Sequence, residues 1–198
     1  ELQFFVPGLT VYNNQTVGQT NINIRGVGTA GNSVSLESSV GIYVDGVYRS
    51  RQSSSIGDLV DLERVEVLKG PQGTLFGKNT ASGAIQFLTR KPDLEAVGGF
   101  LELQAGNENY GSFKGAVNIP LVTGRSAIRL SGSSSQRDGY IDNITTNTDT
   151  NDRDRYSIRG QLLMTNGDDL TLRLIADYSA IDEVCCAASN IFDGPGDN

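Results

Sequence analysis

The chain has 198 residues and a formal net charge of −7 at pH 7, and it contains 24 glycines and no histidine. An acidic balance of this kind excludes a nucleic-acid binder that relies on a basic face. The absence of histidine excludes catalytic sets of the Ser/His/Asp or Cys/His type. The many glycines favour turns and strands over long helices.

The first half of the chain contains short elements of mixed type. Asp45-Gly46 can supply the two positive-φ positions of a tight hairpin turn. Ser54 or Ser55 is expected to cap a short helix. Alternating and apolar runs predict strands at residues 21–24, 40–48, 64–68 and 84–90. These elements predict an α+β domain with a small mixed sheet over residues 1–92, too small to be very stable by itself.

Beyond residue 97 the pattern indicates strands alone. Apolar and polar residues alternate in five consecutive segments, so each segment has one apolar and one polar face. The apolar face is predicted to hold Leu103, Val117, Ile128, Leu130, Leu162, Leu172 and Leu174, and the polar face Glu102, Lys114, Arg129, Arg159 and Arg173.

Connection lengths distinguish two architectures for these strands. Alternation alone also fits a soluble sandwich. Connections are short at 120–124 and 166–169 and long at 136–154, which is typical of an outer-membrane barrel with turns at one end and loops at the other. We therefore expect residues 97–198 to form about five antiparallel transmembrane β-barrel strands, as an incomplete barrel.

Three segments resemble catalytic or metal-binding motifs without meeting their spacing. The loop from Gly73 to Gly77 has three residues between its glycines where a P-loop has four, and Lys78 lacks the hydroxyl residue that should follow it. The acidic loop 138–154 lacks the register of a calcium site. Cys185-Cys186 lacks zinc-ligand spacing, and the two cysteines are expected to form a bridge or to stay as thiols. The sequence thus predicts no enzyme, no cofactor and no metal site.

A series of ordered motifs carries a family resemblance. Asn23-Ile24-Arg25-Gly26 is followed by Asp45-Gly46-Val47-Tyr48, and later by the run from Glu63 through Leu68-Lys69-Gly70-Pro71 to Gly73. At this spacing the motifs resemble the plug domain of TonB-dependent outer-membrane receptors, and the resemblance covers most of residues 1–92. It implies a plug inside a transmembrane barrel, in the outer membrane of a Gram-negative bacterium.

The resemblance also implies a transport function. Receptors of this family import scarce solutes, such as iron–siderophore complexes, cobalamin or glycans, with energy passed on by the TonB protein. We therefore expect a siderophore receptor that meets outer-membrane lipid, a small-molecule ligand and TonB, the last through a segment upstream of this chain. Because a transporter barrel has roughly 22 strands, the chain is expected to be the first part of a longer receptor. The alternative is a soluble or surface-attached β-rich ligand-binding protein.

Site residues follow from the same resemblance. Outward-facing plug loops meet the ligand in the family, and Arg49 and Arg51 are the only cations of the corresponding loops 27–39 and 49–54. They are expected to contact an anionic ligand, or else to stay hydrated or pair with nearby acids. The full set of expected ligand residues is Asn13, Asn14, Thr29, Asn32, Ser33, Arg49, Arg51 and Gln52.

Two plug cations form a latch with barrel glutamates in the family. By motif these cations are Arg25 and Lys69 in this chain. Lysine keeps the positive charge but loses the bidentate geometry of arginine, so the Lys69 half is expected to be the weaker one.

Overall fold

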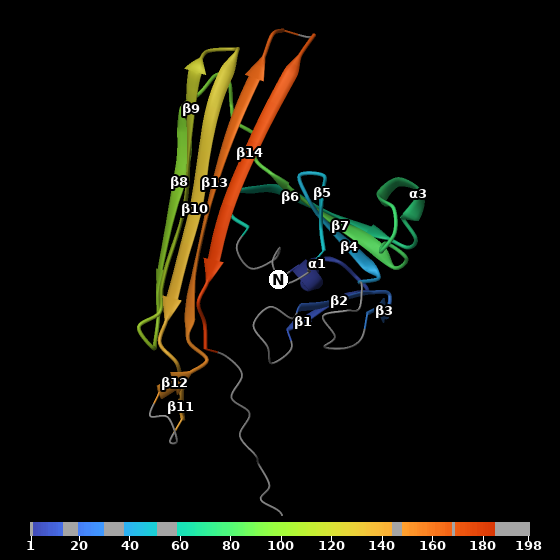
Figure 1. Ribbon diagram of the computed structural model, residues 1–198, viewed down its shortest axis with the longest axis vertical. Helices are drawn as coiled ribbons and strands as arrows, with labels where there is room; N and C mark the ends of the chain where they lie inside the picture. Colours follow the sequence, from blue (N-terminus) through green and yellow to red (C-terminus); the bar gives the residue numbers. More distant parts are fainter. Residues whose placement is uncertain are drawn as a thin grey trace, which may run out of the picture.

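The computed structural model describes residues 2–13, 20–29, 38–50, 59–143, 148–167 and 169–184. The structure contains a five-stranded sheet. Figure 1 shows this tall sheet beside a smaller amino-terminal body, which comprises the elements from α1 to β7. The helix predicted to begin at Ser54 or Ser55 and the pair Cys185-Cys186 lie outside the described residues.

The amino-terminal body contains two small sheets. The first is antiparallel, in the order β1-β2-β3, and the second is mixed, in the order β5-β4-β7-β6, because β4 runs parallel to β7. This confirms the predicted α+β body with its mixed sheet and the four predicted strand regions. The elements are α1 (Leu2–Phe5), β1 (Leu9–Asn13), β2 (Thr20–Ile24), β3 (Val27–Gly28), β4 (Val40–Val44), β5 (Val47–Arg49), β6 (Leu62–Lys69), α3 (Gly73–Phe76) and β7 (Gly83–Thr89).

A compact apolar core joins these two sheets. Ile22 and Ile24 of β2 pack with Ile42 of β4 and Ile85 of β7, and each of these side chains is buried. All five residues of β4 are buried, which explains its unbroken run of apolar residues and glycine. The turn between β4 and β5 is the predicted one, since Asp45 and Gly46 have φ angles of 49° and 83°.

Tyr43 ties α3 to the mixed sheet. Its hydroxyl donates a 2.6 Å hydrogen bond to the carbonyl oxygen of Phe76, and the two rings lie 4.9 Å apart. Burial raises the pKa of Tyr43, and the neighbouring Tyr48 adds to the effect. The glycine-rich loop that resembled a P-loop is therefore packed, through its one short helix, onto the face of β4 opposite the Ile42 core.

The second half of the chain forms a single antiparallel sheet in the order β14-β13-β10-β9-β8, as predicted. A small hairpin, β11-β12, occupies the long connection between β10 and β13 and was not predicted. The strands are β8 (Gly98–Ala105), β9 (Gly111–Val122), β10 (Ser126–Arg137), β11 (Ile141–Asn143), β12 (Thr148–Thr150), β13 (Arg153–Thr165) and β14 (Thr171–Ile181).

The two faces of this sheet have the predicted composition. Ile128 pairs with Leu162, which pairs with Leu174, and Leu174 is 52% exposed on the face turned away from the amino-terminal body. Arg129 and Arg159 point to the opposite face and are buried against that body. We call these the outer and the inner face. Within the described residues no second sheet covers the outer face, so the sandwich architecture is not formed there.

None of the helices in the described residues is long and apolar enough to cross a membrane.

Gly83 is expected to tolerate no side chain. Its φ is 151°, and an added Cβ would meet the carbonyl oxygen of Leu68 and lie 2.7 Å from Cδ1 of Ile24. Gly83→Ala should therefore destabilise the full-length protein by about 1–3 kcal/mol in chemical denaturation followed by tyrosine fluorescence. Gly98→Ala is the matched control, because Gly98 also begins a strand and an added Cβ there meets nothing within 4 Å. Equal denaturation midpoints for the two variants would contradict this account.

Candidate functional site

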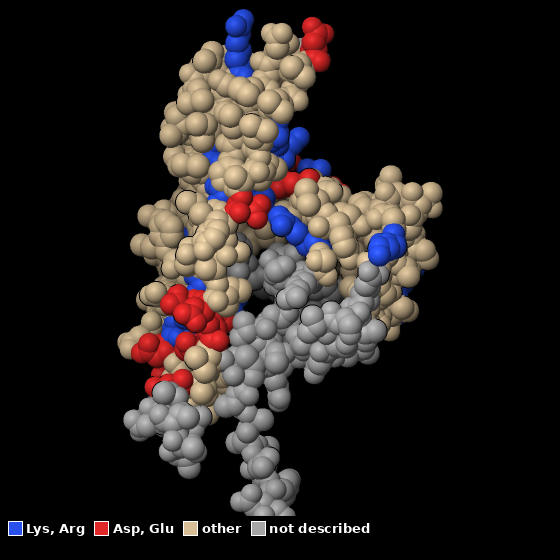
Figure 2. All heavy atoms as spheres, in the orientation of Figure 1, with Lys and Arg blue, Asp and Glu red and all other residues tan. Residues whose placement is uncertain are grey.

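Charged side chains join the amino-terminal body to the inner face of the five-stranded sheet. Two aspartates of the body, Asp45 and Asp61, face three arginines on adjacent strands, Arg129 of β10, Arg159 of β13 and Arg173 of β14. Figure 2 shows acidic and basic side chains meeting where the body touches the sheet. The site is therefore an interface between two parts of the fold and does not lie within either of them.

Asp61 and Arg129 form a bidentate pair. Arg129 donates from Nε to Oδ2 at 2.5 Å and from Nη2 to Oδ1 at 2.7 Å. The two side chains are 3% and 7% exposed, so the pair is shielded from water. Asp61 lies in a bend just before β6 with a φ of 64°, an angle that aspartate tolerates better than most residues. Loss of either partner would leave a buried charge without its counter-ion.

Asp45 is the centre of a second network. Its Oδ1 accepts hydrogen bonds from the backbone N–H of Thr89 at 3.0 Å and from Arg173 Nη2 at 3.4 Å. Its Oδ2 accepts from the hydroxyl of Thr89 at 2.7 Å and from Arg159 Nη1 at 2.8 Å. Gln161 on β13 completes the network, because its Oε1 accepts from Nε and Nη2 of Arg173 at 3.0 and 2.6 Å. The β4–β5 turn, the end of β7 and two strands of the sheet are thus held together.

The connection between the two parts is fixed by one asparagine. Asn118 of β9 is 1% exposed and donates from Nδ2 to the carbonyl oxygens of Asp93 at 2.9 Å and Ala96 at 2.7 Å. Its Oδ1 accepts the N–H of Asp93 at 2.8 Å. These three hydrogen bonds satisfy the buried amide in place of water. They also fix residues 93–96, so the chain reaches β8 along a defined path.

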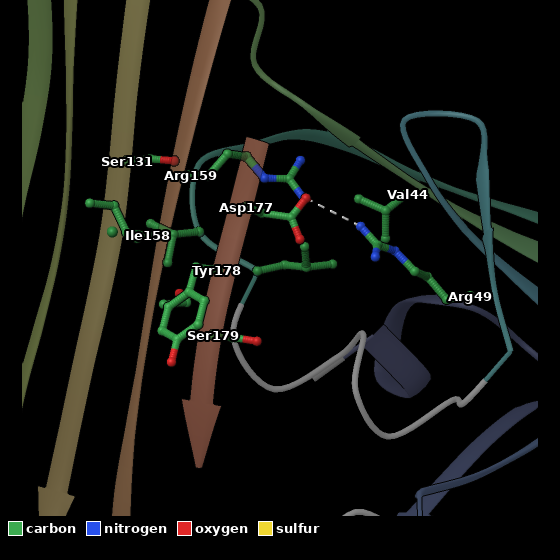
Figure 3. Close-up of a pocket in the computed structure, with 12 residues that line it drawn as sticks. Val44, Arg49, Ser131, Ile158, Arg159, Asp177, Tyr178 and Ser179 are labelled. Carbon is green, nitrogen blue, oxygen red and sulfur yellow. Dashed lines mark hydrogen bonds and ion pairs between the residues drawn. The ribbon is translucent and has the colours of Figure 1, made fainter. Parts of the chain in front are cut away.

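A cavity of about 150 Å³ lies at the same interface. Figure 3 shows Arg49 reaching from the end of β5 towards Asp177 of β14, with Arg159 on the other side of that carboxylate. Nη2 of Arg49 and Nη2 of Arg159 each lie 3.4 Å from Oδ1 of Asp177. Ser131, Ser157 and Ser179 of the inner face add hydroxyl groups to the lining. The cavity therefore offers cations and hydroxyls to a polar ligand.

Three of the eight expected ligand residues lie in the described part of the chain. Arg49 lines the cavity, and Thr29 accepts a 2.8 Å hydrogen bond from the backbone N–H of Ser39. Asn13 ends β1. The other five, Asn14, Asn32, Ser33, Arg51 and Gln52, lie outside the described residues.

The two expected latch cations contact the same turn. Arg25 donates its backbone N–H to the carbonyl oxygen of Gly8 at 2.7 Å, and Nζ of Lys69 donates to that of Pro7 at 2.8 Å. Within the described residues neither side chain pairs with a carboxylate. Their latch role stays a prediction.

The sequence did not identify Asp45 and Asp61 as interface residues. Asp45 was recognised only as a turn residue, although its carboxylate was available for a second role. The sequence did predict three arginines on one face of adjacent strands. Arginines that become buried need acidic partners, so this pattern could have indicated nearby aspartates or glutamates.

Comparison with known proteins identifies the chain's relatives. Residues 2–84 match the family described as TonB-dependent Receptor Plug Domain. The ferrioxamine B receptor of Salmonella typhimurium is 34% identical over 146 residues, which cover 69% of this chain and 19% of that protein. The pesticin receptor of Yersinia pestis is 33% identical over 114 residues, which cover 58% of this chain and 16% of that protein. The matched part of the chain thus spans less than a fifth of these relatives.

Solved structures show the same arrangement. The ferric yersiniabactin uptake receptor FyuA from Yersinia pestis matches with a TM-score of 0.78 and 27% identity, over 88% of this chain and 27% of that one. The pyoverdine receptor FpvA from Pseudomonas aeruginosa, bound to pyoverdine, matches with a TM-score of 0.68 and 26% identity, over 87% and 23% of the two chains.

The plug match, the receptor relatives and the docking of a small α+β body on the polar face of antiparallel strands all agree. The chain belongs to the TonB-dependent outer-membrane receptors.

Proposed function

We propose that the chain is part of a receptor that imports an iron–siderophore complex into the periplasm, with energy delivered by TonB. The observation that carries the proposal is a plug held by buried aspartate–arginine pairs on the polar face of strands whose other face is apolar. Three relatives named above are receptors for ferrioxamine B, ferric yersiniabactin and pyoverdine, which supports a ferric siderophore as the ligand.

The division of the chain belongs to the same proposal. We assign residues 1–92 to the plug and 97–198 to the first strands of the barrel. The path fixed by Asn118 between Asp93 and Ala96 supports a boundary there. The family is one of receptors and transporters, and we assign no catalytic role to the chain.

The exposed apolar side chains of the outer face support a sheet that lies in the membrane over a soluble protein. Leu101, Leu103 and Leu174 are more than half exposed there, and a soluble sheet would have to cover them with a second layer. In a barrel this face meets hydrocarbon, where exposed apolar side chains carry no cost.

We propose that the eight plug residues given above contact the ligand, with Arg49 as the principal contact among those described. Its guanidinium lines the interface cavity and is one-third exposed, so it can donate charge-assisted hydrogen bonds to an anionic ferric complex. Arg25 and Lys69 are proposed as latch residues; the backbone N–H of Arg25 and Nζ of Lys69 donate to neighbouring carbonyl oxygens of one turn, which supports a shared role.

The function can be tested with the full-length receptor in a Gram-negative host that lacks its own siderophore receptors. Uptake of radioactive iron would be measured with ferrioxamine B, yersiniabactin and pyoverdine, in strains with and without TonB. We expect uptake of at least one complex and its loss without TonB. Uptake of none, or uptake that does not depend on TonB, would overturn the proposal.

An arginine on the outer face should hinder folding into a membrane. Leu174 faces outward and its neighbour Ile175 faces inward, because successive side chains on β14 alternate. Near the middle of the bilayer, Leu174→Arg should cost about 2–4 kcal/mol in a folding titration into lipid vesicles. Ile175→Arg is the matched control and should cost clearly less. An equal cost for both variants would reject the assignment of faces.

Removal of the Asp61 charge should destabilise the docked plug. Asp61→Asn leaves Arg129 buried beside a neutral amide, which should cost about 3–5 kcal/mol in chemical denaturation of the full-length receptor. Glu102→Gln is the control, because Glu102 pairs with Lys114 at 3.8 Å and both side chains are nearly half exposed. That change should cost less than about 1 kcal/mol. Equal losses of unfolding free energy in the two variants would contradict the role of Asp61 as an anchor of the plug.

Arg49→Ala should weaken binding of the imported ferric siderophore. A charge-assisted hydrogen bond is worth about 1.5–3 kcal/mol, so Kd should rise about tenfold or more in equilibrium titration. Arg64→Ala is the matched control, since Arg64 is an exposed arginine of β6 that pairs with Glu63 and Glu66 and does not line the cavity. A Kd that stays the same in both variants would remove Arg49 from the ligand site.

A further inference from the structure

Asp177 of the barrel wall makes weak ion pairs with one arginine of the plug and one arginine of the neighbouring wall strand. Its Oδ1 receives Nη2 of Arg49 from the plug and Nη2 of Arg159 from the neighbouring strand, both at 3.4 Å. These distances exceed the usual 2.7–3.2 Å of a protein N–H···O hydrogen bond. The carboxylate is 42% exposed, so water screens both contacts. Asp177 can therefore change partners at small cost.

Arg159 is shared between two carboxylates. It holds Asp45 through Nη1 at 2.8 Å and Asp177 through Nη2 at 3.4 Å. The contact with Asp45 is both shorter and more buried, with side chains 10% and 4% exposed. Arg159 is thus held mainly by Asp45, where it anchors the plug.

These contacts form a row of alternating charges: Arg49, Asp177, Arg159 and Asp45. Both ends of the row belong to one plug hairpin, because Asp45 is in its turn and Arg49 ends β5. The two middle members belong to adjacent barrel strands and are register partners. Arg49–Asp177 and Asp45–Arg159 are thus two contacts of the hairpin with one pair of wall residues, and Asp45 has a further, longer contact with Arg173 at 3.4 Å.

We propose that Asp177 and Arg159 are positioning residues that couple an anion at Arg49 to release of the plug anchor at Asp45. An anion that takes Arg49 leaves Asp177 with Arg159 as its remaining cation among the described residues, and Asp177 then competes more strongly with Asp45 for that guanidinium. The Arg49–Asp177 and Asp45–Arg159 contacts then weaken together, and within the described part of the chain Asp45 keeps only its longer contact with Arg173 on the wall. The ligand role of Arg49 rests on the proposed function, whereas the competition for Arg159 is read from the contacts alone.

The competition can be tested without a ligand by the passive entry of vancomycin, a large antibiotic that a plugged barrel should exclude. In the full-length receptor Arg49→Gln mimics the occupied state, because it frees Asp177 from Arg49. We expect the inhibitory concentration of vancomycin to fall about fivefold or more, in line with typical coupling between sites. Adding Asp177→Asn to Arg49→Gln should restore exclusion, since no competitor for Arg159 is left.

Controls separate this coupling from simple damage to the interface. Asp45→Asn should admit vancomycin whether or not Asp177 is changed, and Arg64→Gln should leave exclusion intact. Receptor levels in the outer membrane would be compared by immunoblot. Exclusion by Arg49→Gln equal to that of the unmodified receptor, or a double variant as leaky as Arg49→Gln alone, would overturn the proposal.

A second measurement uses Asp177→Asn alone with the ferric siderophore that the unmodified receptor imports. We expect KM to stay unchanged or fall and the maximal uptake rate to fall about tenfold, because binding no longer loosens the anchor. An unchanged maximal rate would reject the coupling while leaving the import function standing. Failure of the unmodified receptor to import any complex would instead reject the proposed function, and the vancomycin result would still decide the coupling.

Discussion

The burial of two plug carboxylates against arginines of the barrel wall is the constraint on which the rest of this structure depends. Asp45 and Asp61 are 4% and 3% exposed, and a carboxylate removed from water to that extent requires a counter-ion and filled hydrogen-bond positions. Their partners come from strands 68 and 114 residues further along the chain. Without the wall the two plug aspartates would lack their counter-ions, and without the plug so would the arginines of the inner face.

The same constraint explains the composition of the five-stranded sheet. Its inner face carries arginine, asparagine and glutamine because it meets a polar plug surface, and its outer face carries leucine and isoleucine that nothing covers within the described residues. A soluble protein arranges its sheets with the apolar face inward. The reversed arrangement is the one that a lipid environment stabilises.

The strength of the contacts changes across the interface. Asp61–Arg129 is bidentate and dry, the Asp45 network fills both carboxylate oxygens, and the Asp177 contacts beside the cavity are long and partly hydrated. Interactions of the first kind hold a position, and those of the last kind exchange partners easily. The weakest contacts are those of Asp177 with Arg49 and Arg159, beside the proposed ligand site. Ligand binding would therefore change the ion pairs that are easiest to break.

The sequence by itself determined the features that local chemistry controls. Period-two alternation assigned Leu174 and Arg129 to opposite faces, and Asp45-Gly46 marked a hairpin turn, because both depend only on neighbouring residues. Short elements such as α3 and β11 were not predicted, because they are too short to show a helical or strand periodicity in the sequence. Only the tertiary structure decided which acid faces which arginine and that Arg49 shares Asp177 with Arg159. Alternation fixes the face of a side chain, whereas its partner depends on how distant segments of the chain pack together.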